Sequence, residues 1–182
     1  MVSNEEILVN KRNGRGKEAL QIDKIHAMVG FATDGITGVS ASHVEMNSGI
    51  QLFDGISTAD IQQILIKSAN DLITLESPNY QYVAARLLLF SLRKQLFHRL
   101  WDHPKLIDHI KKLIDMGLYD KDILVNYDES EIDRMNMWID HERDYNFTYA
   151  GLRQVMDKYL VQDRSTGEIF ETPQFMYMMI SA

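Results

Sequence analysis

The residues with the clearest potential for chemistry form a cationic cluster near the start of the chain. Lys11, Arg12, Arg15 and Lys17 supply four cations within seven residues that include no acid, in a chain that is acidic as a whole. Lys and Arg side chains, together with backbone N–H groups, suit a polyphosphate. The alternative is a solvated turn whose charges keep a strand edge from pairing, and spacing alone does not decide between the two.

Three further residues could complete a nucleotide pocket. Lys24 follows the cationic cluster, and Lys94 lies four residues after Phe90 in a helical pattern. An aromatic or aliphatic wall can hold a base while lysines hold phosphates. Taken singly, each lysine is better explained as a surface residue and Phe90 as a core residue.

Other motifs do not reach a recognisable catalytic or metal-binding pattern. The run after Gly14 lacks the spacing and the Ser or Thr of a phosphate-binding P-loop. His98, His103 and His109 are not spaced as a helical metal pair, and His141 lacks the second histidine of a zinc protease. We interpret these histidines as surface or interface residues.

The carboxylates and the absent cysteines limit the chemistry further. Asp140, Glu142 and Asp144 show no pairing, and we interpret them as a charged helix face or turn. The chain contains no cysteine, which excludes disulfides, thiolate-bound zinc and a cysteine nucleophile. We therefore expect no catalytic residue, no metal site and no redox cofactor in this chain.

Composition places the chain among folded globular proteins. Its 182 residues are enough for one domain, or for a small domain joined to part of another, and 45% of them are hydrophobic. A net charge of -7 argues against general nucleic-acid binding. The start MVSNEEILVN is unlike a secretory signal, and no long uncharged apolar run follows. These features predict a cytoplasmic protein with no nucleic-acid or membrane partner.

The pattern of residues predicts a mainly α-helical fold with small β-hairpins. Asn13-Gly14 is a strong turn signal between two apolar stretches, so residues 7–22 read as a hairpin. Asp23 could then cap a first helix that ends near Gly35. Further helices are expected at residues 40–53, 57–75 and 79–100, the second of them capped by Ser57.

Beyond the turn at residues 101–104, the helical patterns become shorter. They are expected at residues 106–116, 121–127, 129–139 and 148–160, followed by a second hairpin at 161–170 and an apolar helix from Thr172 onward. This last helix is apolar on nearly every side, as a helix inside a larger protein would be. We expect the natural fold to continue on the same polypeptide or on a separate partner.

Several stretches resemble a known family. VNKRNG at 9–14, IDKI at 22–25 and DGISTADI at 54–61 resemble the ATP-cone domain found at the start of ribonucleotide reductase large subunits. SPNYQYVAARL at 77–87 closely resembles that family's P-x-Y-x-Y-x-A-A-R-L run. IDHERD at 139–144 and GEIFETPQF at 167–175 resemble the region where the cone gives way to the catalytic α/β barrel. The likeness is nearest to class I proteins of enteric bacteria and T4-like bacteriophages.

The resemblance implies a domain division and a set of nucleotide-binding residues. Residues 1–100 would form an ATP cone, a hairpin with four helices, and residues 101–182 the incomplete helical start of the barrel domain. In the cone, the residues expected at the nucleotide are Lys11, Arg12, Glu18, Ala19, Leu20, Gln21, Ile22, Asp23, Lys24, Thr58, Gln62, Phe90 and Lys94. Gln62 stands where the bacterial family has a histidine.

The resemblance also implies a role in DNA precursor synthesis. The cone would bind ATP as activator or dATP as inhibitor, with Mg²⁺ accompanying the nucleotide, and would regulate assembly for ribonucleotide reduction. Its expected partners are the remainder of the large subunit, the radical-generating small subunit and further copies of the large subunit, in a bacterial or phage-infected cell. The family's reactive cysteines lie beyond the matched region, so this chain alone could not catalyse the reaction.

Two alternatives stay open. The chain could be a non-catalytic assembly module that has lost nucleotide sensing, because its hairpin tip is one residue longer than the bacterial pattern and because Gln62 stands where that pattern has a histidine. A transcriptional repressor that uses the same cone is disfavoured by the absence of a cysteine-based zinc element and by the acidic balance.

Overall fold

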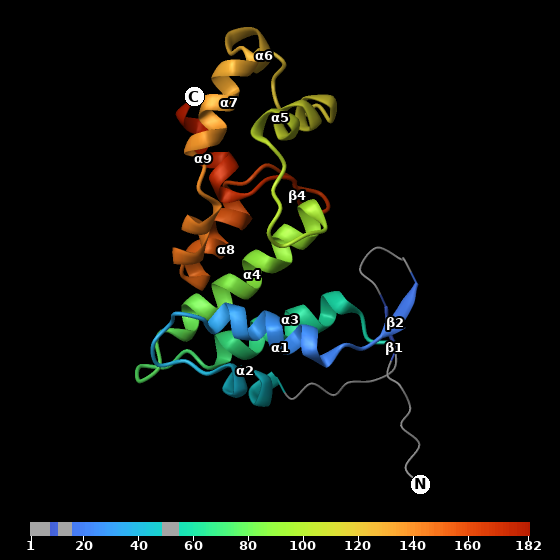
Figure 1. The fold of residues 1–182 in the computed structure, drawn as a ribbon, viewed down its shortest axis with the longest axis vertical. Helices are drawn as coiled ribbons and strands as arrows, with labels where there is room; N and C mark the ends of the chain where they lie inside the picture. Colours follow the sequence, from blue (N-terminus) through green and yellow to red (C-terminus); the bar gives the residue numbers. More distant parts are fainter. Residues whose placement is uncertain (1–7, 11–15, 49–54) are drawn as a thin grey trace. The chain divides into compact units, whose positions relative to one another are not determined.

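The structure is a computed structural model that describes residues 8–10, 16–48 and 55–182. It divides into two compact units (Figure 1). Unit 1 comprises Met1–Ser91 with Phe147–Ala150, and unit 2 comprises Leu92–Asn146 with Gly151–Ala182. None of the helices in the described part of the chain is long and apolar enough to cross a membrane.

Unit 1 opens with the predicted hairpin. Strand β1 (Leu8–Asn10) pairs antiparallel with β2 (Lys17–Ala19), and Val9 lies opposite Glu18. Positions 11–15, which hold the expected turn, lie outside the described residues. The strands are short, and Val9 is the one member of β1 that is fully buried. The hairpin is confirmed at its two strands.

Four helices follow the hairpin. They are α1 (Ile22–Thr33), α2 (Ala41–Ser48), α3 (Thr58–Asp71) and α4 (Tyr80–Phe97). One expectation is wrong: Asp23 lies inside the first turn of α1, and Gln21 is the N-cap. Ser57 does cap α3, because its hydroxyl accepts a hydrogen bond from the Asp60 N–H at 3.0 Å.

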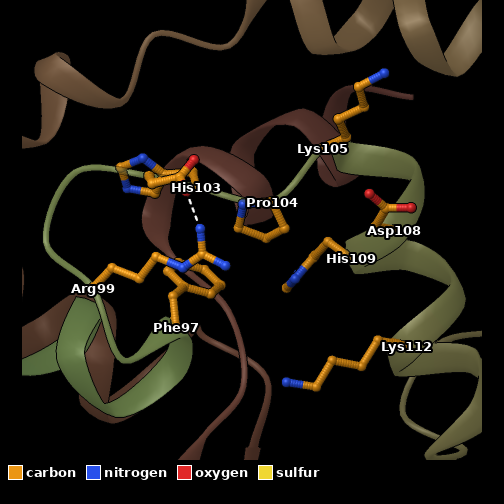
Figure 2. A pocket seen from close by; sticks show the side chains of 9 residues that line it. Phe97, Arg99, His103, Pro104, Lys105, Asp108, His109 and Lys112 are labelled. Atoms are coloured by element: carbon orange, nitrogen blue, oxygen red, sulfur yellow. Dashed lines mark hydrogen bonds and ion pairs between the residues drawn. The ribbon is translucent and has the colours of Figure 1, made fainter.

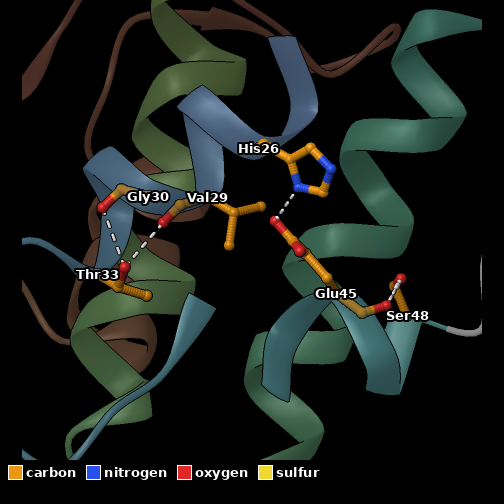
Figure 3. A network of polar contacts seen from close by, with 6 residues as sticks. All are labelled: His26, Val29, Gly30, Thr33, Glu45 and Ser48. Carbon is orange, nitrogen blue, oxygen red and sulfur yellow. Dashed lines mark hydrogen bonds and ion pairs between the residues drawn. The ribbon is translucent and has the colours of Figure 1, made fainter. Parts of the chain in front are cut away.

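The core of unit 1 is built from one face of each helix. Apolar side chains at helical spacing meet there because burying them removes their surface from water. The fully buried members include Val29 of α1, Val44 of α2, Leu65 of α3, and Val83 and Leu87 of α4. Figure 3 shows a polar contact at the rim of this core, where His26 Nδ1 of α1 lies 2.7 Å from Glu45 Oε1 of α2.

Unit 2 contains shorter helices and the second hairpin. Its elements are α5 (Leu106–Asp115), α6 (Ile123–Asn126), α7 (Glu129–Trp138), the 3₁₀ helix η1 (His141–Asn146), most of α8 (Tyr149–Lys158), β3 (Gln162–Asp163), β4 (Glu168–Ile169) and α9 (Pro173–Ser181). The last turn of α4, from Leu92 onward, also belongs to this unit. The predicted second hairpin and the helix after Thr172 are confirmed.

The core of unit 2 forms around α5, α7 and α9. Leu106 and Ile110 of α5, Ile132 of α7 and Phe175 of α9 are buried together. Helix α9 buries Pro173, Phe175 and Met176 but leaves Tyr177 and Ile180 exposed. The fold class expected from the sequence, mainly helical with small hairpins, is therefore confirmed. The expected division between residues 100 and 101 stays a prediction.

Candidate nucleotide-binding site

Strand β1 lies between two partners in unit 1. On one side it pairs with β2, and on the other it hydrogen-bonds the segment that leads into α3. The Gly55 N–H donates to the Leu8 carbonyl at 2.8 Å, and the Asn10 N–H donates to the Ile56 carbonyl at 3.0 Å. The Asn10 side chain adds a bond from Nδ2 to the Gly55 carbonyl at 2.6 Å. The hairpin is thereby tied to a segment more than forty residues along the chain.

This arrangement places two helix N-termini beside the hairpin (Figure 1). Helix α1 begins at Ile22, three residues after the Ala19 end of β2, which we call the hairpin base. Helix α3 begins at Thr58, after Ser57, which bridges in parallel to Asn10 at the opposite end of β1. A helix N-terminus carries a partial positive charge, which favours an anion and is here partly offset by an acid in each first turn, Asp23 in α1 and Asp60 in α3.

The predicted residues of β2 and α1 lie along the hairpin base. Glu18, Ala19 and Leu20 are half-buried, whereas Gln21, Ile22, Asp23 and Lys24 are exposed. The N-cap of α1, Gln21, makes no side-chain capping hydrogen bond. Lys24 is an exposed cation in the first turn of α1, and Lys17 is an exposed cation at the other end of β2. Lys11 and Arg12 lie outside the described residues.

The two predicted residues of α3 lie in different surroundings. Thr58 is half-buried at the first position of the helix. Gln62 is only 2% exposed, and its Nε2 donates to the Leu87 carbonyl of α4 at 3.3 Å. Its side chain therefore joins two helices, and a ligand at the hairpin base would reach it only after rearrangement.

On α4, Phe90 and Lys94 also differ in their surroundings. Phe90 is fully buried, and its ring centroid lies 5.5 Å from that of Phe31 on α1. Lys94 is half-buried and lies one turn further along α4, past the division between the two units at Ser91 and Leu92. In this structure Phe90 belongs to the helix core, as its position in the sequence pattern alone predicted.

The interpretation of the histidines as surface or interface residues is wrong for His109, which is 2% exposed, whereas His103 and His141 are half-buried. In unit 2 the rings of His103 and His141 stack with centroids 3.7 Å apart, and His109 stacks on Phe175 at 4.3 Å. Burial lowers the pKa of His103 and of His109 to about 4 and that of His141 to about 3. His98 remains exposed. The three packed rings are neutral at pH 7 and serve as core aromatics.

One of the three carboxylates is also misassigned by the sequence pattern. Asp140 and Glu142 are exposed as expected, but Asp144 is 1% exposed and lies 3.7 Å from the Arg93 guanidinium. Gln174 Nε2 donates to Asp144 at 2.8 Å. Burial raises the pKa of Asp144 to about 6.

Arg93 is the central residue that sequence reasoning missed. It is 1% exposed and donates to the Tyr145 hydroxyl at 2.8 Å and to the His141 carbonyl at 2.7 Å. A sequence signal existed, because Arg93 interrupts an apolar run in which flanking residues are buried. A cation inside such a run indicates a buried acceptor set.

The described residues offer binding chemistry and no catalytic constellation. They contain no cluster of three or more His, Asp or Glu side chains that could hold a metal ion. The chain has no cysteine. The feature with a direct chemical use is the hairpin with the two helix starts beside it, where lysines and helix N-termini favour an anion.

Comparison with known sequences identifies the family to which this chain belongs. The model of the ATP cone domain matches residues 7–95, and that of the ribonucleotide reductase all-alpha domain matches residues 145–182. The chain is 46% identical, over 98% of its length, to the ribonucleoside-diphosphate reductase 1 subunit alpha of Escherichia coli K12. The chain belongs to the ribonucleotide reductase large-subunit family.

Other large subunits of this family show the same extent of likeness. The subunit alpha of Haemophilus influenzae is 48% identical over 98% of the chain, and that of Enterobacteria phage T4 is 41% identical over 95%. The chain spans 23% of the length of each of these relatives. It corresponds to their amino-terminal region.

The family models separate the two regions described above. All residues expected at the nucleotide, from Lys11 to Lys94, lie within the ATP cone match. The stacked histidines His103, His109 and His141 lie between the two matches, and their neighbour Phe175 lies within the all-alpha match. The ATP cone and the packed histidines are therefore separate features of this reductase chain.

Proposed function

We propose that the chain is the nucleotide-sensing part of a ribonucleotide reductase large subunit. It binds ATP as activator and dATP as inhibitor, each with Mg²⁺, at the base of the β1–β2 hairpin. The observation that carries this proposal is the attachment of β1 to the segment before α3, which places the start of α3 beside the Asn10–Lys17 pair while α1, with Lys24 in its first turn, starts at the other end of β2. The family match over residues 7–95 supports the choice of adenine nucleotides.

The residue roles follow from charge and position. Lys11, Arg12, Lys24 and Lys94 bind the phosphates, because cations pair with phosphate oxygens through charge-assisted hydrogen bonds. The stretch from Glu18 to Asp23 lies along the nucleotide, on β2 and the start of α1. Thr58 hydrogen-bonds the nucleotide from the start of α3. Gln62 and Phe90 support the helices behind the site.

The bound nucleotide then controls assembly for the reduction of ribonucleotides to deoxyribonucleotides. The partners are the remainder of the large subunit, the radical-generating small subunit and further large subunits. The cysteines needed for the reduction are supplied outside this chain, which has none. A cytoplasmic location in a bacterial or phage-infected cell is consistent with the reductase relatives.

Titration calorimetry of the 182-residue chain tests nucleotide binding. We expect saturable binding of ATP and of dATP, and a loss of affinity of roughly five- to tenfold in Lys24→Ala, since one charge-assisted contact is lost. The matched control is Lys67→Ala on α3, whose exposed side chain pairs with Asp71 at 3.0 Å, away from the hairpin. No binding by folded protein at about 1 mM nucleotide would refute the proposal.

One observation favours a second function, an assembly module without nucleotide sensing. Gln62 occupies a family ligand position, yet its amide is committed to the Leu87 carbonyl. Under this alternative, Lys11→Ala and Lys94→Ala would leave nucleotide affinity unchanged while association with reductase subunits persisted. Calorimetry and co-sedimentation with the small subunit distinguish the two functions.

A further inference from the structure

Unit 2 contains a pocket of about 470 Å³ between the end of α4 and the start of α5 (Figure 2). Its wall includes Phe97, whose ring meets the His103 ring edge-on at 5.7 Å. Its other side is formed by α5, through Lys105, His109 and Lys112. None of these residues belongs to the proposed nucleotide site, so the pocket is a separate feature.

The charges at the pocket leave a cationic surplus. Arg99 and Asp102 pair with each other, which removes one cation and one carboxylate from the balance. Lys105 and Lys112 then remain against the single carboxylate of Asp108. Both lysine side chains are exposed, and neither forms an ion pair with another residue in the described part of unit 2. They are available to an anion.

A buried donor at the same place lacks an acceptor. His109 is only 2% exposed, and its Nε2 is a buried atom with no hydrogen-bond partner. Figure 2 shows that its ring and the Lys112 side chain extend from α5 into the same space. A buried polar atom without a partner is unfavourable, so such atoms usually have a partner. This orphaned nitrogen points to an acceptor that occupies the pocket.

The start of α5 adds to the positive potential. Lys105 is the N-cap of this ten-residue helix and makes no side-chain capping hydrogen bond. The Leu106 N–H at this helix start donates to Asn136 Oδ1 at 2.8 Å, and the positive end of the helix dipole lies on the same side as the Lys105 side chain. A cation-rich pocket with a helix end and an N–H donor suits an oxyanion.

We propose that this pocket binds a phosphate group. Lys105 and Lys112 pair with its oxygens, and His109, protonated on Nε2, donates a hydrogen bond to it. The pocket volume lies within the range of about 300–1,000 Å³ that is typical of small-molecule sites. The phosphate is either the free ion or part of a small phosphate monoester whose carrier lies against Phe97 and His103.

Nuclear magnetic resonance of the imidazole nitrogens tests the proposal on the whole 182-residue chain. Sodium phosphate is titrated at pH 7.5, with sodium chloride adjusted to hold ionic strength constant. We expect a saturable shift of the His109 ring signals and no shift of those of His26 in unit 1. A second titration uses AMP: saturation at lower concentration than with phosphate identifies a monoester site, and equal saturation identifies a free-ion site.

Charge variants provide the decisive comparison. Lys105→Gln and Lys112→Gln should each weaken the phosphate effect at His109 by roughly five- to tenfold, since each removes one charge-assisted contact. Lys111→Gln is the matched control, because it removes the same charge from the same helix, where Lys111 pairs with Glu129 at 2.7 Å. A shift that never saturates, or that is equal in all three variants, would overturn the proposal.

Discussion

At the scale of single residues, unit 2 depends on a buried polar set around Arg93. Its guanidinium reaches Asp144, the Tyr145 hydroxyl and the His141 carbonyl, all at positions of low exposure. A buried pair adds little net stability compared with apolar residues, but removal of one partner leaves an uncompensated charge. The set should therefore be sensitive to single substitutions.

Asp144→Ala should destabilise unit 2 by about 3–5 kcal/mol, because Arg93 then keeps its buried charge without its carboxylate. Urea unfolding followed by tryptophan fluorescence measures this, since both tryptophans, Trp101 and Trp138, lie in unit 2. Glu142→Ala, an exposed neighbour in η1, is the control and should change little. A loss below about 1 kcal/mol for Asp144→Ala would contradict the buried-charge argument.

The three packed histidines predict acid sensitivity of the same unit. Their pKa values lie near 4, 4 and 3 in the fold and near 6.5 in the unfolded chain, so the unfolded state binds more protons as pH falls. For His109 alone the loss of unfolding free energy between pH 7 and pH 5 is about 2 kcal/mol. Asp144 and Glu171 act oppositely as pH falls, because burial raises the pKa of both carboxyl groups, but they are two groups against three.

Urea titrations at pH 7 and pH 5, read by tryptophan fluorescence, measure this difference. Unit 2 should be less stable at pH 5, and His109→Gln should show a smaller difference between the two pH values than the unaltered chain. Equal unfolding free energies at pH 7 and pH 5 would show that the histidines are protonated in the folded state.

At the scale of elements, helix starts are specified by short local signals where a side chain makes the cap. Asp128 caps α7 in a reciprocal capping box: it accepts from the Glu131 N–H at 2.9 Å while Glu131 accepts from the Asp128 N–H at 3.0 Å. Asp122, the N-cap of α6, makes no side-chain capping hydrogen bond. The two aspartates thus form a natural pair for comparison.

Asp128→Ala should cost about 1 kcal/mol of stability in unit 2, because the Glu131 N–H and the Ser130 hydroxyl lose their acceptor. Asp122→Ala should cost much less, since no capping bond is removed. Both are read by tryptophan fluorescence in urea. If the two substitutions have the same effect, the capping box does not stabilise α7 in solution.

The element scale also shows where local signals fail. Ser57 was identified as a cap from its own sequence context, and the structure confirms it. Asp23 has the right residue type and the wrong position: the N-cap of α1 is Gln21, two residues earlier, and the helix begins at Ile22. A cap is decided by where the preceding strand ends, and that point depends on pairing with a distant segment.

At the scale of the whole molecule, the chain carries its proposed binding features in separate units. Apart from Lys94, the residues assigned to the nucleotide belong to unit 1, whereas the residues of the phosphate pocket and the Arg93 set belong to unit 2. Each unit has its own buried core. Ligand effects should accordingly be localised along the chain.

Hydrogen–deuterium exchange with and without ATP tests this localisation. With the same phosphate concentration in both samples, ATP should protect peptides from the start of α1 (Ile22–Thr33) and the start of α3 (Thr58–Asp71), because bound ligand stabilises the state that it contacts. Peptides from α7 in unit 2 serve as the internal control. Protection centred on unit 2 would place the nucleotide elsewhere.

The sequence by itself determined the fold class, most helices, both hairpins and the family. These features are encoded locally, by hydrophobic period, turn residues and caps, or by motifs that extend along the chain. The cationic cluster and the absence of cysteine also limited the possible functions of the chain. Residue types alone decide whether a chain has the groups for phosphate binding or for thiol redox chemistry.

Only the tertiary structure decided which polar residues are buried together. Arg93 and Asp144 are 51 positions apart, and His103 and His141 are 38 positions apart, so no local pattern connects them. The same holds for the hairpin, where residues near position 10 bond to residues near position 56. Burial and pairing of such groups depend on how distant segments pack, and that packing sets their charge state and their availability to a ligand.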